Sequence, residues 1–245
     1  MSRLLVSLAL VAVLMAPLVA TPQEEASGWR RVAPGLELRE QVLDGSPTWL
    51  LRVDPKQRRL GAEVREPGFL VGEWVDREGV LASLNANYFD AAGAPLGWAV
   101  VDGHERLKPN RRGWGLFHVD DAGRAGISRA ASPPGGSITT AVQAGPLLVE
   151  AGTANSRLRP ARARRSFVGI DARGRVVLGC STRSIDLPTL ARLLAATPDG
   201  GGLGLRDALN LDGGSSSQLY CRDGREEGDL VVPGFARVPV VLTVR

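Results

Sequence analysis

The feature that most constrains the fold is the repeated alternation of short apolar segments with turn residues. The chain has 245 residues, of which 30 are glycine and 16 are proline. Asp-Gly and related glycine-containing turns separate apolar runs that are mostly short enough for single strands. This pattern predicts many strands joined by hairpins and favours such a structure over a bundle of long helices.

The clearest hairpin is predicted over residues 166–181, where two apolar runs flank the turn Asp171-Ala172-Arg173-Gly174. A helix is predicted over residues 186–197, with Asp186 as its N-cap and Pro188 in its first turn. The apolar face of this helix consists of Leu187, Leu190, Leu193 and Leu194.

A second, short amphipathic helix is predicted over residues 68–79, ending at Gly79. With few helices among many strands, the sequence predicts an α+β fold class with a mostly antiparallel or mixed sheet.

The N-terminus has the pattern of an export signal. Arg3 precedes an apolar run from Leu4 to Met15, and small residues follow up to Ala20. The run is short for a membrane-spanning helix, so cleavage is favoured over an uncleaved anchor. We expect a signal peptide at residues 1–20, a polar linker at 21–28 and a single domain at 29–245. The mature protein is then secreted or periplasmic, with no stable membrane insertion.

The charge pattern argues against nucleic acid as a partner. The formal net charge is +4, but the arginines are scattered, and the one dense basic cluster lies at residues 157–165. Aromatic residues do not alternate with these arginines, as they do on single-stranded nucleic-acid binders. Arginine side chains also suit phosphate oxygens, so the cluster is compatible with a phosphorylated ligand.

The scarcity of histidine and cysteine excludes several chemistries. Only His104 and His118 are present, and both are expected to be structural. Cys180 and Cys221 form either one disulfide or two buried thiols, and the sequence leaves both alternatives open. No Gly-x-Ser-x-Gly elbow, phosphate-binding Walker loop or dinucleotide-binding glycine motif occurs, and no cofactor is predicted. Metal dependence and oligomeric state stay open.

The carboxylates, amides, hydroxyls and arginines beside glycines suit carbohydrate chemistry instead. The segment Ala208–Tyr220 reads ALNLDGGSSSQLY, in which an apolar run ends at Asp212 before two glycines and three serines. Taken alone, Asp212 is equally compatible with an Asx-turn and with a catalytic carboxylate beside bare backbone.

Four segments occur in the order expected for one family. They read LNANYFDAAGAPLGWAVVDG at residues 84–103, AVQAGPLLVEAG at 141–152, RRSFVGIDARGRVVLGC at 164–180 and DALNLDGGSSSQLY at 207–220. Together they resemble the phosphodiester glycosidase family over roughly residues 80–245. The resemblance implies hydrolysis of a sugar-1-phosphodiester bond, in a substrate similar to an N-acetylglucosamine-1-phosphodiester or a phosphoglycan.

The resemblance also implies site residues. Asp212 becomes the catalytic carboxylate, Asp90 a candidate second carboxylate and Arg165 the phosphate ligand. The remaining substrate-binding candidates are Asn85, Asn87, Gln143, Asn210, Gly213, Gly214, Ser215 and Ser216. Asn87 stands where the family commonly has glycine, and Ser215 and Gln218 alter the fourth motif. These departures bear on the sugar preference more than on the reaction.

Two alternatives from other classes remain. The domain can be a non-catalytic binder of envelope carbohydrate, which would keep the pocket without turnover. It can also be an unrelated exported serine hydrolase, which would require His104 or His118 within hydrogen-bond reach of a serine.

Overall fold

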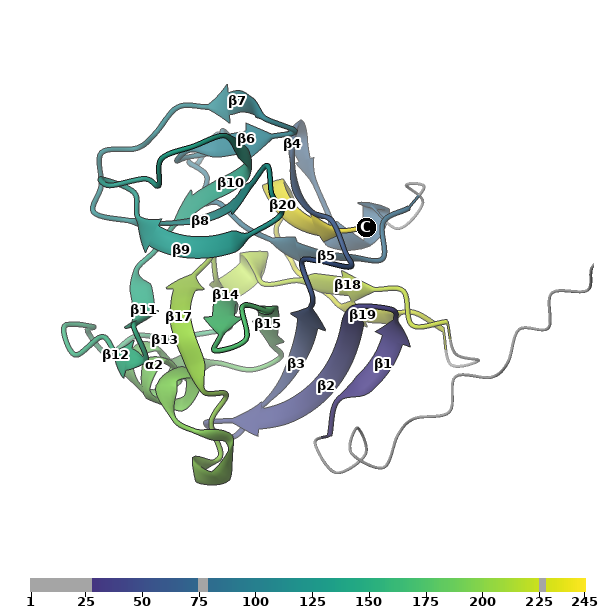
Figure 1. Cartoon of the computed structure of the whole chain (residues 1–245), viewed down its shortest axis with the longest axis vertical. Coiled ribbons are helices and arrows are strands. Elements are labelled where there is room, and N and C mark those ends of the chain that lie inside the picture. Colours follow the sequence, from purple (N-terminus) through teal and green to yellow (C-terminus); the bar gives the residue numbers. More distant parts are fainter. Residues whose placement is uncertain (1–27, 75–78, 225–227) are drawn as a thin grey trace, which may run out of the picture.

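The computed structural model describes residues 28–74, 79–224 and 228–245 (Figure 1). The predicted signal peptide and all of the predicted linker except Gly28 lie outside these residues. The described chain forms 20 strands, one α-helix and three short 3-10 helices, and its sheets are antiparallel throughout. The mostly antiparallel architecture is therefore confirmed. The α+β class is only loosely supported, because a single nine-residue helix leaves the domain predominantly β.

The largest sheet occupies the lower half of Figure 1 and has the strand order β1-β2-β3-β15-β14-β17-β11-β12. Its strands are β1 (Arg30–Ala33), β2 (Leu36–Leu43), β3 (Ser46–Val53), β15 (Val176–Ser181), β14 (Ser166–Asp171), β17 (Leu205–Asn210), β11 (Leu147–Glu150) and β12 (Thr153–Ala154). The predicted hairpin over residues 166–181 is confirmed as the pair β14 and β15, which are joined by an antiparallel ladder.

Two five-stranded sheets lie above it. The first has the order β7 (His104–Leu107), β6 (Ala99–Val101), β10 (Ile138–Ala144), β8 (Gly115–Asp120) and β9 (Ala125–Arg129). The second has the order β19 (Leu230–Val232), β18 (Leu219–Cys221), β5 (Ala82–Asn85), β20 (Val238–Val244) and β4 (Leu60–Phe69). A small ladder pairs β13 (Arg162–Ala163) with β16 (Ile185–Asp186).

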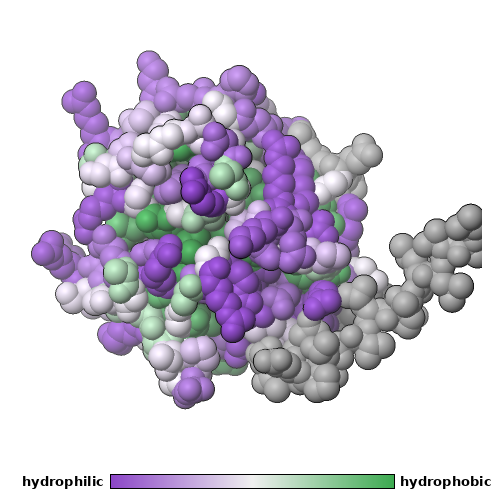
Figure 2. Space-filling model, viewed as in Figure 1, coloured by the Kyte–Doolittle hydropathy of each residue, from purple (hydrophilic) through white to green (hydrophobic). Residues whose placement is uncertain are grey.

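One hydrophobic core joins the three large sheets. Leu51 comes from the eight-stranded sheet, Leu84 from β5 and Phe117 from β8, and all three are fully buried in the same cluster. Full burial of such a side chain contributes about 1.5–3 kcal/mol. Since each sheet hides one face in this core, the strand ends around it are held in fixed positions. Figure 2 shows hydrophilic side chains covering most of one face of the molecule.

The helix predicted over residues 186–197 is confirmed as α2 (Leu187–Ala195). Its buried Leu190 and Leu194 pack in a second core cluster with Phe167 of β14. The Asp186 side chain does not cap the helix. Its Oδ1 instead accepts the Ala161 N–H at 3.0 Å, so this carboxylate fixes the neighbouring loop.

The helix prediction for residues 68–79 is wrong in its first part, and residues 75–78 lie outside the described residues. Strand β4 continues to Phe69, and a 3-10 helix, η1 (Val71–Trp74), follows it. Phe69 is fully buried at the β4 end of the ladder with β20, so strand pairing outweighs the helical spacing. The other 3-10 helices are η2 (Pro198–Gly200) and η3 (Gly214–Ser216).

Both cysteines are free and buried, which decides between the two alternatives in favour of separate thiols. Burial raises the pKa of Cys180 to about 11 and that of Cys221 to about 12, so both stay protonated and poorly nucleophilic near neutral pH. Within the three described ranges, no helix is long and apolar enough to cross a membrane.

Candidate active site

The four sequence motifs meet where strands of different sheets end. The Asp212 N–H donates to the Ala86 carbonyl, just beyond β5, at 2.9 Å. The Leu211 N–H donates to the Ser166 carbonyl at the start of β14, also at 2.9 Å. The Asn210 N–H donates to the Pro146 carbonyl, just beyond β10, at 3.0 Å. Backbone hydrogen bonds therefore fasten the segment 210–212 to each of the other three motifs.

Asp212 is the half-buried carboxylate at this junction. Its Oδ1 accepts the Gly213 N–H at 2.9 Å. Burial raises the pKa of Asp212 above its ordinary value, and hydrogen bonding from Ser216 and from the Gly213 N–H opposes that rise. The acid is thus kept in a poorly solvated position, as is common for catalytic carboxylates.

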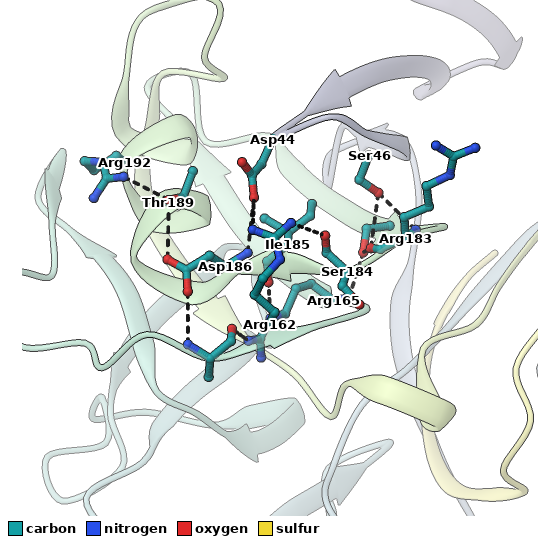
Figure 3. A network of polar contacts seen from close by, with 12 residues as sticks. Asp44, Ser46, Arg162, Arg165, Arg183, Ser184, Ile185, Asp186, Thr189 and Arg192 are labelled. Carbon is teal, nitrogen blue, oxygen red and sulfur yellow. Dashed lines mark hydrogen bonds and ion pairs between the residues drawn. The ribbon is translucent and has the colours of Figure 1, made fainter.

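Arg165, which immediately precedes β14, approaches the same glycine segment. Its side chain is buried, and its Nε donates to the Ile185 carbonyl at 3.3 Å while Nη2 donates to the Ala161 carbonyl. The third nitrogen, Nη1, lies 3.9 Å from the position that a Cβ on Gly213 would occupy. Figure 3 shows Arg165 within the polar network around Asp186 and Asp44. The guanidinium is therefore held by main-chain acceptors with its Nη1 near the glycines.

Burial lowers the pKa of Arg165, while the nearby Tyr88 and Asp186 oppose that change. An arginine remains a cation at neutral pH even so, because its ordinary pKa is far above that pH. The site therefore contains a fixed positive charge beside Gly213.

Tyr88 is a site residue that the sequence did not single out, although it lies inside the first motif. Its hydroxyl donates to the Gly145 carbonyl at 2.5 Å and accepts the Asn210 Nδ2 at 3.0 Å. Burial, followed by the negative charge of Asp212, raises the pKa of Tyr88 to about 12, whereas the Asn210 bond and the charge of Arg165 oppose the rise. The hydroxyl is therefore protonated near neutral pH.

Two of the predicted sugar-binding amides are occupied by the protein itself. Asn85 is fully buried, and its Nδ2 donates to the Asp212 carbonyl at 2.7 Å while its Oδ1 accepts the Ser166 hydroxyl at 2.6 Å. The Gln143 Oε1 accepts the Trp98 and Asn110 N–H groups, both at 2.8 Å. The geometry thus makes these amides supports of the loops around the site.

The other two amides each have a carbonyl oxygen without a partner. Asn210 Nδ2 donates to the Gly145 and Leu211 carbonyls, and Asn87 Nδ2 donates to those of Leu96 and Trp98. The Oδ1 atoms of both asparagines are buried and accept no hydrogen bond from protein. Leaving such an atom unsatisfied costs about 1–3 kcal/mol, so both oxygens are acceptors for a hydroxyl or a water.

The glycines and serines of the fourth motif have different environments. A Cβ on Gly213 would lie 2.8 Å from the Arg164 carbonyl, so this position needs glycine for close packing. Gly214 has φ +64° and open space above it, which leaves bare backbone accessible. Ser216 is buried beside Asp212, whereas Ser215 is exposed.

Asp90 lies outside this group. Its side chain is exposed, and its Oδ1 accepts the Ala92 and Ala94 N–H groups, both at 2.9 Å. The structure thus gives the Asp90 carboxylate a role in closing its own turn.

The site also bears on the serine hydrolase alternative and on metals. His104 is exposed at the start of β7, and His118 lies in β8 with a buried Nδ1 that accepts no hydrogen bond. Among the described residues, neither histidine hydrogen-bonds to a serine, so the His–Ser pair that this alternative requires is not formed. The same residues contain no group of three or more His, Cys, Asp or Glu side chains that could hold a metal ion.

Solved structures share this arrangement of antiparallel sheets. The catalytic domain of zebrafish N-acetylglucosamine-1-phosphodiester alpha-N-acetylglucosaminidase, auto-inhibited by its pro-peptide, matches with a TM-score of 0.63 and 17% identity. The match covers 88% of this chain and 85% of that one. A hypothetical protein from Synechocystis matches with a TM-score of 0.60 and 17% identity over 85% of this chain and 61% of its own. Both define the class of fold.

The chain belongs to the phosphodiester glycosidase family, whose sequence profile matches residues 78–245. Among curated relatives, the uncharacterized protein YigE of Escherichia coli (strain K12) is 30% identical over 157 residues. The matched part spans 59% of this chain and 59% of that relative. The family confirms the resemblance carried by the four motifs.

Proposed function

We propose that the protein is a glycosidase that hydrolyses a sugar-1-phosphodiester bond. The observation that carries this proposal is that the Asp212 carboxylate and the Arg165 guanidinium both lie near Gly213. A carboxylate and a fixed guanidinium that both approach Gly213 match the two charges that separate when a sugar leaves a phosphate. Family membership supports the same reaction class.

The reaction breaks the bond between the anomeric carbon and the phosphate oxygen. Positive charge develops on the sugar ring, and Asp212 stabilises it as a carboxylate. Negative charge develops on the departing phosphate, and Arg165 stabilises it. Water supplies the new hydroxyl at the anomeric carbon, and the products are a free sugar and a phosphomonoester.

The Oδ1 atoms of Asn87 and Asn210 are unpartnered but buried, so in this proposal they accept waters that bridge to the sugar hydroxyls. The protonated Tyr88 lies between Asn210 and Gly145 and keeps the Asp212 side of the site in place. The zebrafish relative is named for N-acetylglucosamine, so an N-acetylglucosamine-1-phosphodiester is the first substrate to test.

The proposed site of action is outside the cytoplasm, in the periplasm or the medium. This rests on the signal-like pattern of residues 1–20. N-terminal sequencing of the protein recovered from expressing cells tests it, and retention of Met1 in a cytoplasmic fraction would contradict it.

The function is tested by incubating the purified protein with a panel of α-linked sugar-1-phosphodiesters. We expect release of one sugar, identified by mass spectrometry, and no release by the Asp212→Asn variant. Binding without release by the wild-type protein would favour a non-catalytic carbohydrate-binding domain.

A further inference from the structure

Two cavities adjoin the site on the Tyr88 side. The first has a volume of about 480 Å³ and the second about 330 Å³. Gly113 and Pro146 line both cavities, so the two cavities adjoin each other, and we call them together the Tyr88–Arg157 groove. The Pro146 carbonyl accepts the Asn210 N–H, so this Tyr88–Arg157 groove is fastened to the strand end that leads to Asp212.

The part of the groove nearest the site is aromatic. Tyr88, Phe89 and Trp114 line it, and the rings of Tyr88 and Trp114 are tilted by 44° with centroids 5.0 Å apart. The guanidinium carbon of Arg112 lies 5.7 Å from the centroid of the Trp114 ring. Apolar ring faces beside a cation suit a sugar ring next to an anionic group.

The far part of the groove is polar and carries a surplus of positive charge. Arg129 there is neutralised by Glu150, at 2.7 Å. Arg157 is exposed, and its backbone N–H donates to the Asn155 side chain at 3.0 Å, which fixes its loop. Neither Arg157 nor Arg112 forms an ion pair with any acidic residue that the structure describes.

We propose that the Tyr88–Arg157 groove binds a second phosphodiester-linked sugar unit, so that the preferred substrate is an oligomer of sugar phosphates. The aromatic part takes the sugar, and Arg112 and Arg157 take phosphates. The two cavities together have the size of a ligand larger than one sugar. This inference rests on the proposed function at Asp212, because it assumes that the bond cleaved lies at the Tyr88 end.

The test uses synthetic N-acetylglucosamine-1-phosphodiester probes, a monomer capped by a methyl group and a trimer. Their affinities for the Asp212→Asn variant are measured by calorimetry, alone and combined with Arg112→Gln, Arg157→Gln or Arg106→Gln. Arg106 lies in β7 and lines a different cavity, so Arg106→Gln is a control that removes the same charge away from the groove. We expect the trimer to bind at least tenfold more tightly than the monomer. Each groove variant should reduce that ratio about two- to fivefold, and Arg106→Gln should leave it unchanged.

Equal affinity for monomer and trimer would overturn the inference. So would a trimer-to-monomer affinity ratio that neither groove substitution changes, or one that Arg106→Gln lowers equally. These outcomes are separate from the failure of the proposed function. If the wild-type protein releases sugar from the monomer but shows no length dependence, only the groove assignment is wrong. If the length dependence is seen and no probe is cleaved, the activity is wrong and the groove still binds phosphate oligomers.

Discussion

The fourth-motif turn differs from three hairpin turns that also start with aspartate. In the turns at Asp90, Asp120 and Asp171, one carboxylate oxygen accepts the N–H groups two and four residues later, at 2.8–3.0 Å. After Asp212 those two N–H groups are used elsewhere. The Gly214 N–H donates to the Arg164 carbonyl at 2.9 Å, and the Ser216 N–H donates to the Gly213 carbonyl at 3.2 Å.

The position of glycine explains the difference. The three hairpin turns read Asp-x-x-Gly, and their third following residue is a glycine with φ between +75° and +88°. In the fourth motif the left-handed glycine, Gly214, comes two residues after Asp212. The chain therefore turns earlier, toward Arg164 before β14, and leaves the carboxylate near Tyr88. Because the N–H groups two and four residues after Asp212 do not bind its carboxylate, that carboxylate is available to a substrate.

The largest effect that the comparison predicts is on turnover. Asp212→Asn keeps the shape of the side chain but removes its charge, and we expect kcat to fall about a thousandfold or more. Asp120→Asn, the matched change in a hairpin turn, should retain wild-type turnover. The measurement is sugar release by both variants. An equal loss of activity in the two would contradict a catalytic role for Asp212.

Arg165 should give the next largest effect. Arg165→Lys keeps a cation but cannot donate to the Ala161 and Ile185 carbonyls while facing Gly213. We expect kcat/KM to fall about a hundredfold. Arg162→Lys is the control, because Arg162 is an exposed member of the same network. Equal kinetics for Arg165→Lys and the wild type would show that Arg165 does not bind the phosphate in the reaction.

Tyr88→Phe should have a smaller effect, because it removes only the hydroxyl that joins Gly145 and Asn210. Loss of that link should lower kcat/KM about tenfold. The control is Tyr220→Phe, which removes a hydroxyl of β18 that donates to Asp229, just before β19. If Tyr220→Phe lowered kcat/KM as much as Tyr88→Phe, the loss would reflect general destabilisation.

The smallest predicted effect is on the pH dependence of stability, which should have opposite signs for Asp212 and Asp120. The raised pKa of Asp212 means that the folded state holds this proton more tightly than the unfolded state, so stability falls as pH rises through the folded pKa. Asp212→Asn should therefore raise the melting temperature at pH 7 by about 1–3 °C and lose that gain near pH 3.

Asp120 should behave in the opposite way. Backbone and side-chain hydrogen bonds from Arg124 lower its pKa, so its contribution is present above the ordinary carboxyl range and is lost as pH falls through the folded pKa. Asp120→Asn should therefore lower the melting temperature slightly at pH 7. Thermal scans at pH 3 and 7 measure both effects, and the same sign for the two variants would contradict the comparison.

Local patterns predicted much of this molecule. The β14–β15 hairpin and helix α2 followed from turn residues and apolar spacing, because both depend on near neighbours. The α+β class is only loosely supported, because the one α-helix described has nine residues. Residues 68–69, which fit a helical period, are held in β4 by pairing with β20. The same limit applies to any segment whose partner is distant in sequence.

The site was predictable as a set of motifs but not as a set of roles. Sequence could not show that Asn85 and Gln143 form their hydrogen bonds with groups from distant segments of the chain itself. It also could not show that Tyr88 reaches Gly145, which lies 57 positions away. The spacing of glycine after each aspartate was visible, however, and would have separated Asp90 from Asp212.

We propose that Asp212 promotes cleavage at the anomeric carbon. The most direct measurement is hydrolysis of an N-acetylglucosamine-1-phosphodiester in ¹⁸O-labelled water, with mass spectrometry of the phosphate product. We expect a phosphomonoester without ¹⁸O, because the oxygen from water is placed on the sugar, and we expect no product with Asp212→Asn. Incorporation of ¹⁸O into the phosphate would show cleavage of the phosphorus–oxygen bond and contradict a glycosidase mechanism.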